Sequence, residues 1–144
     1  MTGFSAGWQV WAILAAVFAA LTAIFAKVGV DNVNSDFATF FRTLVVAAVL
    51  GVILFATRQF QPLSSLSPRS VLFLVLSGLA TGASWVCYFR ALKIGNAAQV
   101  APVDKLSVVL VAIFGVVFLG ERLTPTGWIG VALVGSGAVL MALG

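Results

Sequence analysis

Five long apolar stretches, separated by short polar turns, account for almost the whole chain. They run from about residue 7 to 28, 36 to 57, 68 to 92, 97 to 119 and 125 to 143. A helix needs about 20 apolar residues to cross the hydrocarbon of a bilayer, and each stretch supplies that length. A membrane β-barrel needs segments of about ten residues with alternating polarity, whereas these stretches are continuously apolar. The pattern therefore predicts an all-α integral membrane protein whose five transmembrane helices form a single domain, residues 1–144.

The predicted helix starts carry residues that favour helix initiation. Ser67-Pro68 and Thr124-Pro125 each place a capping residue before a proline, and proline fits the first position of a helix. Ser35 or Asp36 is expected to cap the second helix. The turns are short, so little of the chain is expected to lie outside the membrane.

The composition agrees with a membrane protein. Hydrophobic residues make up 62% of the chain and charged residues 8%, whereas a soluble domain carries roughly 25% charged residues. The net charge of +4 indicates basic loops near anionic lipid headgroups. The basic residues are scattered and form no stripe, so a nucleic-acid partner is not expected.

The residue types needed for most protein chemistry are scarce. The chain has a single cysteine, Cys87, and no histidine. An intrachain disulfide is therefore impossible within it, and a metal site is not expected. We expect no cofactor and no catalytic residue, and a membrane enzyme is the least favoured of the functions considered.

Basic residues outside the helix centres divide evenly between the two sides of the predicted domain. On one side are Lys27, Arg90 and Lys93. On the other side are Arg58, Arg69 and Arg122. Basic loops determine membrane orientation, so this balance suggests that copies insert both ways and pair antiparallel. Adding Arg42 and Lys105, which lie inside the helices, to the first side makes the ratio five against three. The alternative to dual insertion is that another feature determines a single orientation.

Three charged residues fall inside predicted helices: Arg42, Asp104 and Lys105. A charge at a helix centre costs about 2.5–3.5 kcal/mol on insertion scales, so such residues are functional candidates. Arg42 and Asp104 lie at similar depths from the same side, with Arg42 roughly 10 Å into its helix at 1.5 Å per residue. We predict that Asp104 pairs with Arg42, or next with Arg90, and not with Lys105, because adjacent side chains point about 100° apart. The pair is either a transport site, where Asp104 binds a cation, proton or amine, or a structural ion pair beside a Lys105 that snorkels to the interface.

Polar and aromatic residues recur on one face of the predicted third helix. Thr81, Ser84 and Tyr88 follow helical spacing, and Trp85 borders them. Hydroxyl groups and aromatic rings together suit a cavity for a solute with polar and apolar parts. The alternative is that the hydroxyls form hydrogen bonds between helices.

Pro102 lies in the second turn of the predicted fourth helix, just before Asp104. It removes one backbone hydrogen bond and can kink the helix. A freed carbonyl beside an acidic residue suits a binding site within the membrane. The alternative is a tolerated kink near a helix end.

Several segments resemble a known family in their order and spacing. Residues 91–102 (ALKIGNAAQVAP) are similar to the junction of helices 3 and 4 in the EamA domain of the drug/metabolite transporter superfamily. Residues 118–123 (FLGERL), followed by WIG at 128–130, resemble the junction into that domain's last helix. Residues 84–90 (SWVCYFR) and 102–107 (PVDKLS) are similar to the five-helix bacterial and archaeal transporter branch.

This resemblance implies export or exchange of small metabolites by alternating access, in the bacterial inner membrane or the archaeal plasma membrane. Most members carry two EamA domains as an inverted ten-helix repeat, whereas this chain resembles one half-repeat. An antiparallel homodimer would restore ten helices, with the path at the repeat interface. The small multidrug-resistance branch uses a glutamate in its first helix, whereas the first helix here has no acidic residue. This departure argues against a proton-coupled drug exporter of that kind, and Asp104 is a candidate for an analogous role.

We therefore expect a secondary transporter that moves small organic metabolites or drugs, with the lipid bilayer and a small-molecule substrate as its partners. The candidate residues on the path are Asp104, Lys105, Arg42, Trp85, Tyr88, Ser84, Thr81, Arg90 and Pro102. The alternative is a non-transporting membrane subunit that assembles with another membrane protein. The substrate, the coupling ion and the direction of transport do not follow from the sequence.

Overall fold

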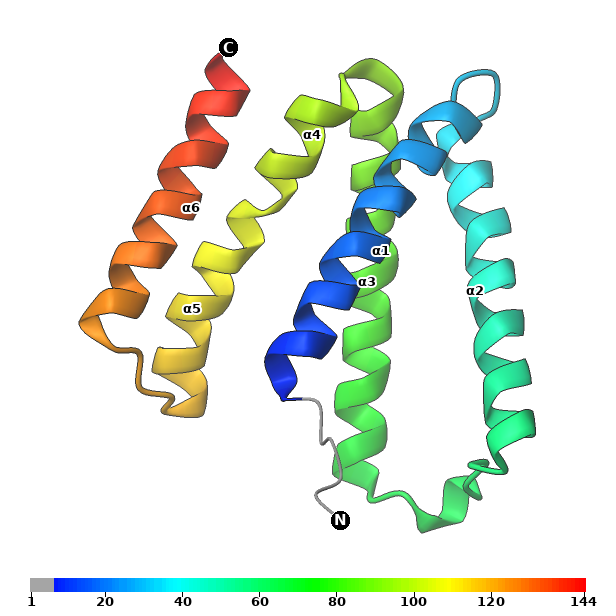
Figure 1. Ribbon diagram of the computed structural model, residues 1–144. Helices are drawn as coiled ribbons and strands as arrows, with labels where there is room; N and C mark the ends of the chain where they lie inside the picture. Colours follow the sequence, from blue (N-terminus) through cyan, green and yellow to red (C-terminus); the bar gives the residue numbers. More distant parts are fainter. Residues whose placement is uncertain (1–6) are drawn as a thin grey trace, which may run out of the picture. The chain divides into compact units, whose positions relative to one another are not determined.

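The computed structural model describes residues 7–144, which form helices joined by short turns and contain no strand (Figure 1). The elements are α1 (Trp8–Gly29), α2 (Ser35–Thr57), the short 3₁₀ helix η1 (Leu63–Ser65), α3 (Pro68–Ile94), α4 (Ala97–Asp104), α5 (Leu106–Leu119) and α6 (Pro125–Leu143). Within this part of the chain, five spans are long and apolar enough to cross a membrane when α4 and α5 are counted together. The predicted all-α fold with five transmembrane helices is therefore confirmed.

The fourth span is interrupted at Lys105 instead of forming one unbroken helix over residues 97–119. The N–H of Lys105 donates to the carbonyl of Pro102 at 3.0 Å, which is the tighter closure of a 3₁₀ turn. Pro102 has no N–H of its own to donate to the preceding turn. The interruption places Asp104 and Lys105 at a helix junction inside a membrane span.

Backbone contacts divide the chain into two compact units. Among the described residues, one unit is Ala26–Lys93, and the other combines residues 7–25 with Ile94–Gly144. The division passes through α1 and falls at the end of α3.

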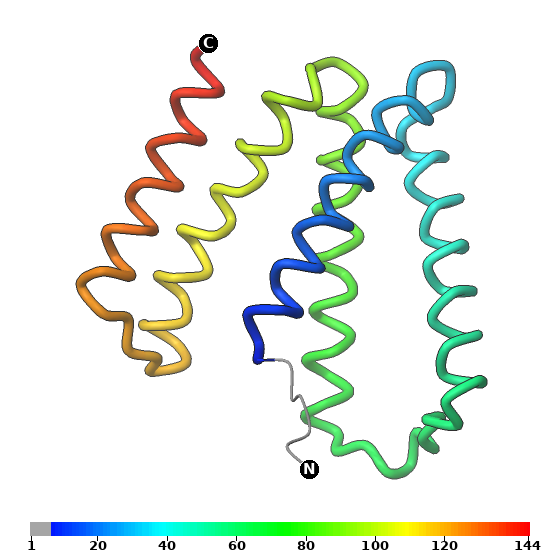
Figure 2. The backbone as a smooth tube through the Cα atoms, in the orientation of Figure 1, coloured from blue at the N-terminus to red at the C-terminus, as the bar shows by residue number. Residues whose placement is uncertain are grey.

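In the unit Ala26–Lys93, α2 and α3 run in opposite directions and are joined by residues 58–67 (Figure 2). Asn34 caps α2, because its side-chain oxygen accepts from the N–H groups of Asp36 at 2.9 Å and Phe37 at 3.1 Å. The predicted caps, Ser35 and Asp36, are therefore wrong: both lie inside the helix, whereas a cap must keep an extended backbone, as Asn34 does.

The predicted cap of α3 is confirmed. The Ser67 hydroxyl accepts from the N–H of Ser70 at 3.1 Å, and Pro68 is the first residue of the helix. Proline is tolerated there because a first-turn N–H has no partner within the helix.

The best-buried side chains of this unit gather where α1 ends, α2 begins and α3 ends. Leu92 and Val30 are fully buried, and Phe89 and Thr39 are 3% and 5% exposed. By contrast, Ser67 and residues 68–84 of α3 are all exposed. The internal packing of the unit is therefore concentrated at one end of its helices.

In the other unit, α6 packs against both α4 and α5. The Thr124 hydroxyl accepts from the N–H of Gly127 at 3.1 Å, which confirms the predicted start of α6. A side chain at Gly135 would place its first carbon 3.1 Å from Cγ2 of Val109 on α5. Because glycine has no such carbon, the α6 backbone can approach α5 closely at this point.

Candidate functional site

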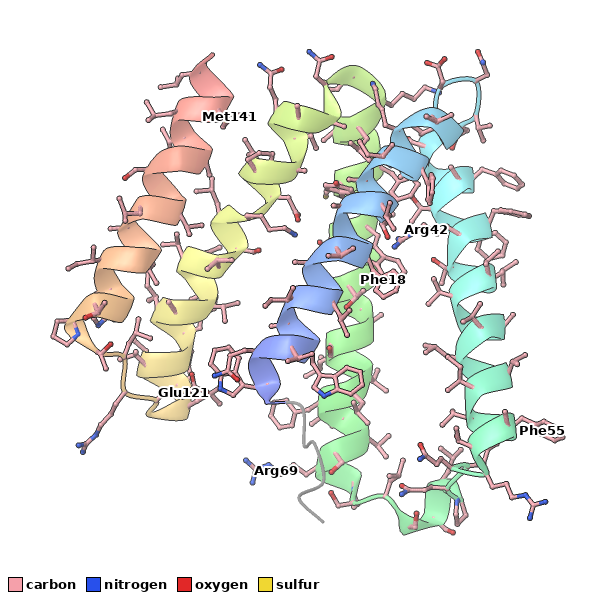
Figure 3. All side chains as sticks on the ribbon, viewed as in Figure 1. Phe18, Arg42, Phe55, Arg69, Glu121 and Met141 are labelled. Atoms are coloured by element: carbon pink, nitrogen blue, oxygen red, sulfur yellow. The ribbon has the colours of Figure 1, made fainter. Side chains whose placement is uncertain are left out.

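Arg42 lies on α2 and places its guanidinium group against two aromatic rings of α3. Its central carbon is 4.4 Å from the centre of the Trp85 ring and 5.6 Å from the centre of the Phe89 ring. Figure 3 shows the Arg42 side chain leaving α2 towards α3. Trp85 and Phe89 are one helical turn apart and share a face of α3. The negative ring faces attract the cation, so this arrangement holds a partly buried charge inside a membrane span.

Arg90 pairs with Asp36, a residue that the sequence analysis considered only as a helix cap. Its Nε donates to Oδ1 at 2.9 Å and its Nη2 to Oδ2 at 2.6 Å. Such two-point contact suits the planar guanidinium. Arg90 therefore binds Asp36. Its predicted pairing with Asp104 would join two different units and stays a prediction. The sequence feature that indicates the Asp36–Arg90 pair is an acid in the first turn of one helix and an arginine near the end of another, both on the same predicted side of the membrane.

Lys27 and Lys93 form a reciprocal lysine clamp between the ends of α1 and α3. Lys27 Nζ donates to the Leu92 carbonyl at 2.7 Å. Lys93 Nζ donates to the carbonyls of Val30 and Val33. The last carbonyls of a helix lack partners within it, and a cation near a helix C-terminus is favourable. The sequence pattern alone indicated only that these lysines are loop charges.

Asp104 pairs with its neighbour Lys105, whose Nζ lies 3.2 Å from Oδ2. The prediction that these two do not meet is therefore wrong. It assumed a regular helix, but Lys105 lies outside both α4 and α5 and its long side chain turns back to the carboxylate. The lysine side chain is 54% exposed and the aspartate 35%, so a further ligand can reach the pair. Pro102, one turn earlier, is partly buried.

The remaining candidates lie along α3. Thr81 and Ser84 are exposed, and Tyr88 is partly buried. The Tyr88 ring meets the Phe89 ring edge to face, with the ring centres 6.5 Å apart. The predicted pairing of Arg42 with Asp104 joins residues of two different units and stays a prediction.

The sequence profile of the EamA-like transporter family matches residues 6–143. The chain belongs to this family. It is also 61% identical over 139 residues to a curated Sinorhizobium protein named as an uncharacterized transporter in the cobO 3′ region. That alignment covers 96% of this chain and 99% of the relative. No solved structure matches the chain.

Membership of the EamA family confirms the resemblance found in the sequence and points to a multi-pass membrane transporter and not to an enzyme. Within residues 7–144, no group of three or more histidine, cysteine, aspartate or glutamate side chains is arranged to hold a metal ion. Within its described spans, this EamA protein holds a guanidinium group against aromatic rings and a carboxylate–ammonium pair at a helix junction.

Proposed function

We propose that this EamA protein is a secondary transporter that moves small organic metabolites or drugs across a bacterial or archaeal plasma membrane as an antiparallel homodimer. The observation that carries the proposal is the Asp104–Lys105 pair at the junction of α4 and α5. Interrupted helices that place polar groups within the bilayer are a recurrent way of building transporter sites.

The pair has the properties of a site that exchanges partners. A charged residue in the membrane is costly unless it is matched, and Lys105 is the match for Asp104 at 3.2 Å. Both side chains remain accessible, so a solute amine, a proton or a cation can replace the lysine at the carboxylate. Pro102 contributes by leaving a main-chain carbonyl of α4 without its usual donor.

Two features support an antiparallel homodimer. The predicted topology places three basic loop residues on each side of the membrane domain, and such balance favours no single orientation. The Sinorhizobium relative is aligned over 99% of its length, so its length corresponds to one domain of this kind. Inverted repeats that surround a path are then supplied by two chains, and the path lies between them.

The test is transport after neutralising Asp104. A screen for solutes that raise the melting temperature of the detergent-solubilised protein identifies a transported candidate, and its uptake is then measured in reconstituted vesicles. We expect Asp104→Asn to lower the initial rate at least about tenfold, because it loses its charge in a site where one proton or cation is exchanged. Size-exclusion chromatography is expected to show an unchanged dimer.

The matched control is Asp31→Asn, since Asp31 is an exposed aspartate in the turn between α1 and α2. This variant should transport as the unaltered protein does. Full transport by Asp104→Asn would overturn the assigned role of Asp104. A protein that carries no solute, and whose assembly with another membrane protein fails on Asp104→Asn, would instead be a non-transporting subunit.

A further inference from the structure

Arg42 has a different kind of partner from Lys27, Arg90 and Lys93, the other cations near the buried core of the unit Ala26–Lys93. Arg90 binds a carboxylate, and Lys27 and Lys93 bind main-chain carbonyls. Arg42 contacts aromatic rings, and among the described residues it makes no ion pair and no side-chain hydrogen bond to an oxygen. Its five N–H donors are therefore still available to an acceptor.

Neither acidic residue of the unit Ala26–Lys93 forms an ion pair with Arg42. Asp36 is held by two donors of Arg90, and in the other unit Asp104 is paired with Lys105. The carboxylate of Glu121 lies against the backbone of α5 at Gly115. Asp31 is in the exposed turn after α1. A cation with no anionic partner inside a membrane span is costly, and contact with two rings recovers only part of that cost.

The geometry also indicates which kind of partner the Arg42 guanidinium group can bind. Trp85 and Phe89 attract the charge of the guanidinium group, whose central carbon lies 4.4 and 5.6 Å from their ring centres. The donors of a guanidinium point outward in its plane, in a fork that matches the two oxygens of a carboxylate or a phosphate. The aromatic rings offer this fork no pair of oxygens, so a carboxylate or a phosphate can still occupy it.

From these observations we propose that Arg42 binds an oxyanion, a carboxylate or a phosphate, of the transported solute. This inference rests on the proposed transport function and names its substrate class: organic anions with an apolar part that lies along Trp85 and Tyr88. A cationic drug would be repelled by Arg42. The same oxyanion chemistry is present in lipid headgroups, so the experiment must separate a soluble anion from a lipid.

The test uses three ligands that share a phenyl ring and differ in the polar group attached to it. Benzoate, phenyl phosphate and benzamide are titrated against the purified protein in a neutral detergent, and the melting temperature reports binding. We expect the two anions, but not the neutral amide, to stabilise the protein. Arg42→Gln should weaken anion binding at least about tenfold, and Arg42→Lys should weaken it less because the charge remains while the fork is lost.

The matched control is Arg69→Gln. Arg69 also lies over an aromatic ring of α3, with its central carbon 5.9 Å from the centre of Phe73, but it is an exposed residue at the other end of that helix. This variant should bind the anions unchanged. Trp85→Leu keeps the charge of Arg42 and removes one ring, so it should weaken the aromatic anions more than inorganic phosphate, and it remains informative if Arg42→Gln does not fold.

Each contrary outcome identifies its cause. The proposal is overturned if no anion stabilises the protein, or if Arg42→Gln responds as the unaltered protein does. Stabilisation that depends on Arg42 but occurs only with phosphatidylglycerol in nanodiscs would make the residue a lipid site. Anion binding that appears only in Asp104→Asn would show that Asp104 is the counterion of Arg42 in the unaltered protein, and this would overturn the proposal. Loss of flux in Asp104→Asn without any anion effect would remove the anion assignment and leave the transport function standing.

Discussion

Arg58 shows how a single residue can be at odds with its local conformation. It follows α2 with a φ of 53°, and it is the one non-glycine residue with positive φ among residues 7–144. The next N–H, of Gln59, donates to the Leu54 carbonyl at 3.0 Å and closes the helix end. Gly120 occupies the equivalent left-handed position after α5, with a φ of 68°. Glycine is the usual residue at such a position because it has no Cβ to clash.

Replacing Arg58 by glycine should therefore stabilise the protein. The left-handed conformation costs a residue with a side chain about 1–2 kcal/mol, and glycine loses roughly 0.5–1 kcal/mol of this advantage through the greater freedom of the unfolded chain. We expect a gain of about 0.5–1 kcal/mol, measured by thermal unfolding in detergent. Arg58→Ala is the control that removes the charge and keeps the unfavourable φ. Equal stability of the two variants would show that the conformation is not the cause.

At the scale of elements, the ends of α1, α2 and α3 are held together by polar contacts around a small core. The reciprocal lysine clamp joins α1 to α3, and the Asp36–Arg90 pair joins α2 to α3. Beneath these contacts lie the fully buried Leu92 and Val30. Lysine stems can cover apolar surface while the ammonium group reaches a carbonyl, which explains how charged residues coexist with this core.

Lys27→Met tests the clamp. Methionine keeps an apolar stem of similar length, but the Leu92 carbonyl loses the donor at 2.7 Å. An acceptor left without a partner typically costs about 1–3 kcal/mol, and we expect the free energy of unfolding to fall by about that amount. Arg122→Met, in the exposed turn before α6, should have little effect. If both variants unfold alike, the clamp does not contribute to stability.

Gly135 tests the packing of α5 against α6. Leucine at this position would force its first carbon to within 3.1 Å of Val109, and overpacking of this kind costs about 1–3 kcal/mol. Gly137, two residues later in the same helix, has no atom within 4 Å of such a carbon. Gly137→Leu is therefore the matched control and should unfold close to the unaltered protein. Equal destabilisation by both substitutions would contradict the close approach at Gly135.

At the scale of the whole molecule, orientation in the membrane decides whether two copies form an inverted pair. Ser64 in η1 and Asn96 before α4 flank the two ends of α3, which is long enough to span the membrane. An impermeant maleimide should therefore label Ser64→Cys and Asn96→Cys each in a fraction of the copies in intact cells. The exposed Cys87 is first replaced by serine, and permeabilised cells provide the reference for full labelling. Labelling of only one position in intact cells would exclude dual insertion.

Much of the fold was predictable from the sequence, but the partners of the charged residues were not. The predicted starts at residues 68 and 125 coincide with the first residues of α3 and α6. They were predictable because proline and the preceding hydroxyl residue act locally. Asp104 was recognised as a membrane charge, but its pairing with Lys105 depends on a break in the helix. Arg42 was also recognised, whereas its contact with Phe89 was not, since periodicity alone does not show how two helices are rotated towards each other.

The sequence by itself therefore determined the helical membrane architecture of this EamA protein, because the length and apolarity of a span are local properties and its backbone hydrogen bonds close within the same segment. Only the tertiary structure decided which charges meet. Lys27 reaches a carbonyl 65 residues away, and Arg90 a carboxylate 54 residues away. Such contacts depend on which helix ends lie together and how the helices are turned, and these are properties of the packed chain and not of any one segment.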